Sequence, residues 1–158
     1  MITNYTQLVN EINKRTEVAV KITSEKLCEK LKEIIQTKYY DEYPNPRYDR
    51  TYMFLNSAVA KMITDSTATI GIDDSYFDYE YSARYTSQSA DSNLSKIGQS
   101  YDGHWTGEDQ TFMASQGYHG SYYIHTEGKF WEEFLDYCNK NARNMLRDEL
   151  RKQGVPIK

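Results

Sequence analysis

Apolar residues recur at helical spacing from the start of the chain to about residue 38. No proline or glycine interrupts residues 4 to 38, so a long helix is predicted there, and Asn4 followed by Gln7 resembles a capping box at its start. Two apolar stripes run along this helix about 100° apart, the first with Leu8, Ile12, Ala19 and Ile22 and the second with Val9, Val20, Leu27, Leu31 and Ile34.

The length of this predicted helix has a structural consequence. At 1.5 Å per residue it would span roughly 50 Å, which is longer than a compact domain of this chain length is wide. One end is therefore expected to overhang the rest of the molecule. The alternative is a bend between Thr16 and Thr23, where β-branched residues cluster and helix propensity is lower.

Shorter elements follow after two prolines that end this helix. Residues 51 to 62 are predicted as a short helix, because Leu55, Val59 and Met62 recur at helical spacing. Residues 67 to 85 are predicted to supply strands. The segment TATIGID is rich in β-branched residues, and after it aromatic and polar residues alternate with the period of a strand.

The remainder of the chain is predicted as a long polar loop, a strand and a helix. Residues 86 to 117 have few apolar residues, residues 118 to 126 have the composition of a strand, and residues 129 to 153 place their apolar residues on one helical face. Gly154 lies at the C-cap position. The fold class is thus α+β in a single domain of residues 1 to 158, with the two long helices packed on one face of a small, mainly antiparallel β-sheet.

The composition of the chain indicates which kinds of partner and which cellular setting to expect. The chain has 158 residues and a net charge of −4, which disfavours capture of nucleic acid or anionic lipid by a basic surface. No apolar run is long enough for a membrane span and the polar start does not resemble a signal peptide, so we expect a cytosolic or assembled soluble protein. The 15 tyrosines suit either subunit contacts or a partly hydrated core.

The sequence offers weak candidates for chemistry. The usual signatures of phosphate, dinucleotide, hydrolase and zinc-protease sites are absent. His119 and His125 lie six positions apart without a recognisable zinc spacing, and Cys138 falls on the apolar face of the last helix, where a thiol is inert. Adjacent acids such as Asp73 and Asp74 are usually solvated. We therefore expect no catalytic residue, no metal ligand and no cofactor.

Three passages resemble the small neck proteins of long-tailed bacteriophages, which join the head to the tail or complete the upper end of the tail. They are the Tyr-rich turn YYDEYPNPRYDRTYMFLNSAV, the strand TATIGID directly after it, and the glycine and histidine turn that leads into the last helix. The residues that match the family pattern are Tyr48, Arg50, Thr51, Leu55, Ser57, Gly120, Gly128, Trp131 and Phe134.

The resemblance implies a virion structural protein that forms a ring around the DNA channel at the neck, assembled in the host cytoplasm. Its partners would be other copies of itself, the neighbouring connector proteins and the tail-tube or tail-terminator proteins. Packaged DNA would pass through without sequence-specific binding, and no membrane would be involved. Thr51 is expected to be the N-cap of the short helix, with Arg50 paired to a carboxylate.

The apolar stripe that starts at Leu8 is the candidate subunit contact, with Leu8, Ile12, Ala19 and Ile22 as its members. Two other functions remain open at this point. One is a small cytosolic enzyme or ligand-binding domain that uses the region of His119 and His125. The other is an adaptor that binds a single protein partner.

Overall fold

The longest element is α1, Tyr5–Ile35, which continues through a π-helical turn, Gln36–Tyr40. The structure is a computed structural model that describes residues 4–42, 52–77, 79–84, 100–105, 107–117 and 129–157. The side chain of Asn4 caps the helix by accepting a hydrogen bond from the backbone N–H of Gln7 at 2.9 Å. The predicted long helix and its cap are confirmed.

The helix runs without a break through the segment where a bend was the alternative. Its 31 residues correspond to about 46 Å. The hydroxyls of Thr16 and Thr23 donate to the carbonyls of Ile12 and Ala19, four residues earlier, at 2.9 Å and 2.7 Å. These β-branched residues are thereby accommodated within the helix.

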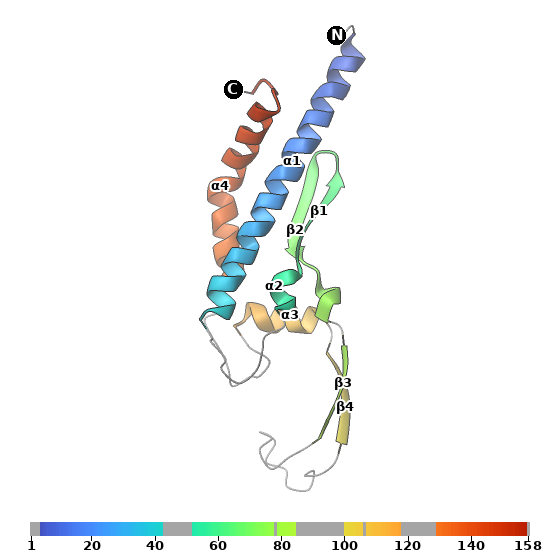
Figure 1. Cartoon of the computed structure of the whole chain (residues 1–158), viewed down its shortest axis with the longest axis vertical. Helices are drawn as coiled ribbons and strands as arrows, with labels where there is room; N and C mark the ends of the chain where they lie inside the picture. The colour runs from blue at the N-terminus through green and yellow to red at the C-terminus, as the bar shows by residue number, and fades with distance from the viewer. Residues whose placement is uncertain are drawn as a thin grey trace.

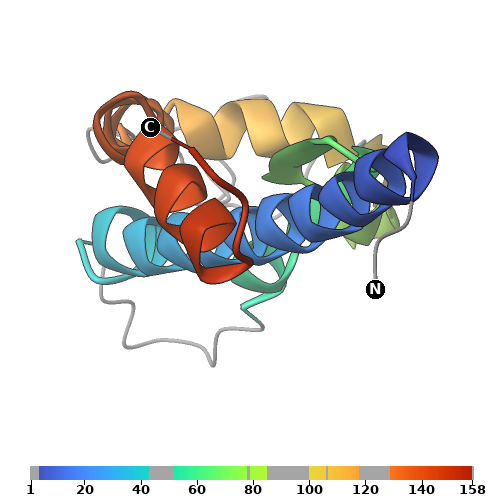
Figure 2. The same ribbon diagram turned by 90° about the horizontal axis from the view of Figure 1, so that it is seen from above.

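The second long helix is α4, Phe130–Lys152, which runs beside α1 in the opposite direction (Figures 1 and 2). It ends as predicted, because Gly154 has a φ of 73° and the N–H of Val155 donates to the carbonyl of Leu150 at 2.9 Å. The C-cap itself is Gln153, whose carbonyl accepts a hydrogen bond from Arg15 of α1 at 3.2 Å. A Cβ atom at Gly154 would lie 2.9 Å from that guanidinium, so glycine also makes room for Arg15.

The predicted helix over residues 51 to 62 is mostly wrong. Only one helical turn forms, α2, Met53–Asn56, and the chain then enters strand β1, Ala58–Thr64, which pairs antiparallel with β2, Thr67–Ile72. Val59 and Met62 are three positions apart, so in the strand they lie on opposite faces and the helical spacing is not used. Ala58 and Ala60 pair with Ile72 and Ile70 and join the core from one face of the strand, so tertiary packing decides the structure.

Two regular elements occupy the second half of the predicted loop over residues 86 to 117. Strand β4, Ser100–Trp105, pairs antiparallel with β3, Tyr79–Arg84, and α3, Gly107–Ser115, follows it. The apolar residues of α3 are consecutive, from Phe112 to Ala114, so they produce no helical periodicity in the sequence. A short 3-10 turn, Asp74–Phe77, connects the two hairpins.

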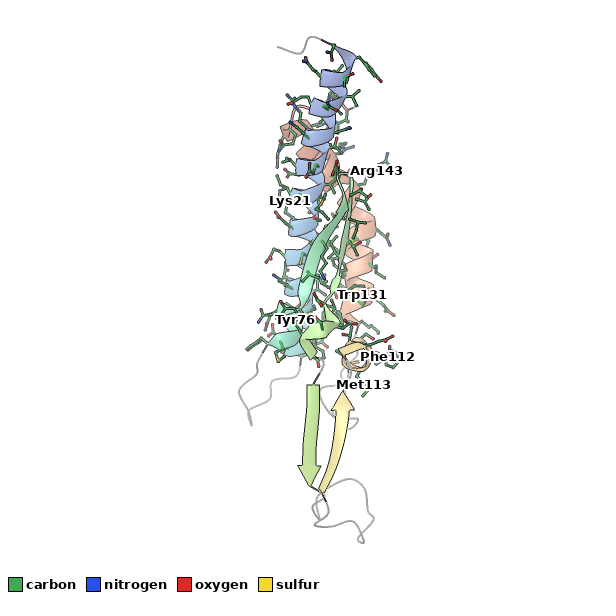
Figure 3. All side chains as sticks on the ribbon, turned by 90° about the vertical axis from the view of Figure 1, so that its right-hand side faces the viewer. Lys21, Tyr76, Phe112, Met113, Trp131 and Arg143 are labelled. Carbon is green, nitrogen blue, oxygen red and sulfur yellow. The ribbon has the colours of Figure 1, made fainter. Side chains whose placement is uncertain are left out.

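The α+β fold class and the antiparallel pairing are confirmed. Within the described residues the strands form two separate two-stranded ladders, β1 with β2 and β3 with β4, in place of one sheet. Figure 1 shows α1 between α4 and the β1–β2 hairpin, and Figure 3 shows that β3 and β4 extend away from the helices. The predicted strand over residues 118 to 126 lies outside the described residues.

The core lies where the C-terminal half of α1 meets the start of α4, α2 and β1. Leu31 and Ile35 of α1 are fully buried there, beside Phe130 and Phe134 of α4. The ring of Phe54 bridges the helices, with its centroid 5.4 Å from that of Phe130 and 5.1 Å from that of Tyr39. Part of the tyrosine content thus serves the core.

A buried carboxylate ties the last turn of α4 to the C-terminal half of α1. Glu149 is 5% exposed, and its Oε1 accepts from Lys26 of α1 at 2.5 Å and from Lys152 at 2.9 Å. These hydrogen bonds to cations hold the pKa of Glu149 below its usual range, with the bond from Lys26 as the largest cause.

Truncation of the central core residue should destabilise the fold strongly. Leu31→Ala is expected to lower the free energy of unfolding by about 2 to 5 kcal/mol, because it leaves a cavity among fully buried side chains. Urea denaturation followed by circular dichroism measures this. Leu135→Ala is the control, since its side chain is 48% exposed. Equal losses in both variants would contradict the placement of the core.

Stability should fall with acidification in a way that depends on Glu149. Because the pKa of Glu149 is lower in the folded state, its contribution is present at neutral pH and is lost as the pH falls below the ordinary glutamate value of about 4.3. Glu149→Gln should therefore be less stable at pH 7 and should lose less stability on acidification than the wild type. Thermal unfolding between pH 7 and pH 3 tests this, and parallel curves would contradict it.

Candidate functional site

The residues that carry the family resemblance fall into two groups. Tyr48, Arg50, Thr51, Gly120 and Gly128 lie outside the described residues. The expectation that Thr51 caps the short helix is wrong. Tyr52 holds the N-cap position, with a φ of 52° and no side-chain capping bond.

The other four residues are brought together at the core, where they have structural roles. Ser57 is fully buried, and Phe134 is 3% exposed. Leu55 and Trp131 are partly buried and pack against the same core cluster, and the Trp131 ring centroid lies 5.7 Å from that of Phe134. The matched positions therefore contribute to packing in the described structure.

Ser57 fixes the junction between α2 and the first hairpin. Its hydroxyl donates to the carbonyl of Phe54 at 2.7 Å, and its own carbonyl accepts from the N–H of Asp73 at 2.8 Å. Asp73 in turn accepts from Ser75 at 2.6 Å and from Lys61 at 2.9 Å, which lowers the pKa of Asp73, with the Ser75 bond as the largest cause. The end of β2 is thus tied to the start of β1.

The candidate subunit-contact stripe on α1 is partly covered by the chain itself. Leu8 is 42% exposed, and Ile12 and Ile22 are partly buried. Ala19 is fully buried within this chain. The prediction is therefore corrected at Ala19, because a residue of the monomer core is not available to a neighbouring subunit.

Apolar residues at the N-terminal end of α1 are only partly covered by the rest of the chain. Figure 1 shows that this end projects past the end of α4 and past the turn between β1 and β2, as the helix length predicted. Tyr5 is 80% exposed, and the next apolar residues follow at i+3, i+4 and i+7. We call this the overhang surface, and its members are the exposed Tyr5 and Leu8 and the partly buried Val9 and Ile12.

A second uncovered apolar surface lies at the other end of the helical body. It is a groove of about 410 Å³ between β2, α3 and the start of α4. We call it the α3 groove, and its lining includes Ile70, Ile72, Thr111, Phe112, Phe130 and Trp131. Figure 3 shows Phe112 and Trp131 at the end of the body from which β3 and β4 extend. Sequence reasoning missed this groove because α3 has no apolar periodicity.

The groups proposed for chemistry are not assembled into a site in the described part of the chain. His119 and His125 lie outside it, and no group of three or more metal-ligating side chains occurs among the described residues. Burial raises the pKa of the Cys28 thiol, and it also raises that of Cys138. Both sulfurs are therefore poor nucleophiles at neutral pH.

Comparison with protein-family models, with curated proteins and with solved structures gives no match for this chain. The likeness to neck proteins therefore rests on the residues quoted above. In the part of the chain that the structure describes, no helix has the length and apolar character needed to cross a membrane.

Removal of the Ser57 hydroxyl should weaken the junction between α2 and β1. Ser57→Ala is expected to cost about 1 kcal/mol of unfolding free energy, because a fully buried hydrogen bond is lost. The matched control is Ser115→Ala, which removes the same kind of bond, from a hydroxyl to a carbonyl three residues earlier, at an exposed position. A larger loss for Ser115→Ala in chemical denaturation would contradict this role.

Proposed function

We propose that this protein is a structural protein of the bacteriophage neck, which forms a ring at the head-tail junction around the DNA channel. The resemblance in the Tyr-rich turn, the following strand and the start of the last helix supports this function. No turnover is required of such a protein. Its work is to hold two assemblies together while DNA passes through.

The observation that carries the proposal is the overhang surface. The core-facing stripe of α1 continues beyond the elements that cover it, and it leaves Tyr5 and Leu8 in contact with solvent. A contiguous apolar surface on one helix face is typical of an interface, because monomeric proteins rarely leave a large apolar patch uncovered. Contacts between ring subunits, or between successive rings, would cover it.

The net charge also suits passage of DNA. With a net charge of −4, the chain has no excess of cations to hold the phosphate backbone by release of counterions. A DNA channel lined by such subunits would favour sliding over binding. The neighbouring connector and tail proteins would bind through the apolar surfaces instead.

The proposal predicts an assembly defect in a phage that carries changes in the overhang surface. Leu8→Asp with Ile12→Asp should leave filled heads and separate tails, with few joined particles, because a charged side chain in an apolar contact weakens association. Electron microscopy of lysates counts the particles directly.

The control is Val18→Asp, a change on the same helix at a side chain that is 42% exposed, as Leu8 is. This variant should give joined particles in normal numbers. Joined particles in a phage that lacks the whole gene would refute the proposed function.

A further inference from the structure

We infer that the overhang surface of one copy docks into the α3 groove of a second copy, so that the chain assembles head to tail. This contact specifies how the proposed ring is joined and rests on that proposed function. It joins the overhang surface, which includes the exposed Tyr5 and Leu8, to the α3 groove. The N-terminal end of α1 and helix α3 lie at opposite ends of the helical body (Figure 1).

The overhang surface has the form of a helix that binds in a groove. Apolar residues at i, i+3, i+4 and i+7 are the anchors by which an amphipathic helix lies in an apolar groove. The segment from Tyr5 to Ile12 supplies this spacing on a helix that the structure already forms. Docking would therefore lose little backbone conformational entropy.

The α3 groove offers matching chemistry. Phe112 is 63% exposed at its wall, and Trp131 and Ile70 add apolar surface. The hydroxyl of Thr111 lines the same groove and is the buried side-chain polar atom that finds no hydrogen-bond partner in the described part of the chain.

The two surfaces are also complementary in charge. Asp74 and Glu108 line the groove, are exposed, and form no ion pair with any described residue. The first turn of α1 contains no acidic residue, so the positive end of its helix dipole has no carboxylate of its own nearby. Docking would bring this helix end toward the two carboxylates of the groove.

The occupant must come from a second copy. The N-terminal end of α1 and the α3 groove lie at opposite ends of the helical body, so a chain does not fill its own groove (Figures 1 and 3). A contact between two different surfaces is heterologous, and it generates a ring when the rotation between copies closes. This is the type of symmetry that a neck ring requires.

Mixing two variants tests the contact. Leu8→Asp is designed to disable the overhang surface and Phe112→Asp the groove, and both side chains are exposed, so neither change buries a charge in the core. Sedimentation velocity over a range of protein concentrations should show wild-type oligomers and a monomer for each variant alone. An equimolar mixture should form a one-to-one heterodimer and nothing larger, because only one competent overhang and one competent groove remain.

Val18→Asp and Leu135→Asp are the matched controls, since they place the same charge at exposed apolar residues outside both surfaces. They should assemble like the wild type. Oligomers that persist in Phe112→Asp, or a mixture that stays monomeric, would overturn the contact and leave the ring proposal standing. A wild-type chain that remains monomeric at every concentration would overturn the contact, whereas the neck function is decided separately by the phage that lacks the gene. A heterodimer in the mixture, together with normal joined phage in the absence of the gene, would support the contact and refute only the neck function.

Discussion

The structure depends on the burial of one side of α1. This helix is longer than the elements that pack against it, so its C-terminal half is enclosed by α4, α2 and the first hairpin while its N-terminal end extends beyond them. Fully buried Leu31 and Ile35 anchor the enclosed half. The exposure of Tyr5 and Leu8 follows from the same geometry, because a straight helix cannot bend back to cover its own end.

Electrostatic and capping contacts keep α4 aligned with α1. Lys26 of α1 bonds to Glu149 in the last turn of α4, and Arg15 bonds to the carbonyl of Gln153 that ends α4. These contacts also set how far α1 projects, because α4 ends where Arg15 meets Gln153. The length of the overhang is thus a consequence of where the glycine after α4 stops the second helix.

The α3 groove has a different origin. The second hairpin extends from the end of the body and α3 returns the chain beneath β2, which leaves a space between the strand, α3 and the start of α4. Phe112 remains at its wall because α3 faces the core through Ala114. The groove and the overhang are therefore built by separate parts of the chain, and this separation allows one copy to present both.

Periodicity along the sequence was enough to determine the long helices, because each buries one continuous stripe and carries its own end signals, Asn4 before α1 and Gly154 after α4. It also identified β2 and β3 and the apolar residues at the start of α1 that stay uncovered. Only the tertiary structure decided the segment around Val59, where the apolar spacing favours a helix and pairing with β2 selects a strand instead. The tertiary structure was also needed to find α3, because its consecutive apolar residues show no helical period. The α3 groove could therefore not be predicted from the sequence. The tertiary structure also decided that Ala19 belongs to the core while Leu8, on the same stripe, does not, since which part of a helix is covered depends on the lengths of its neighbours.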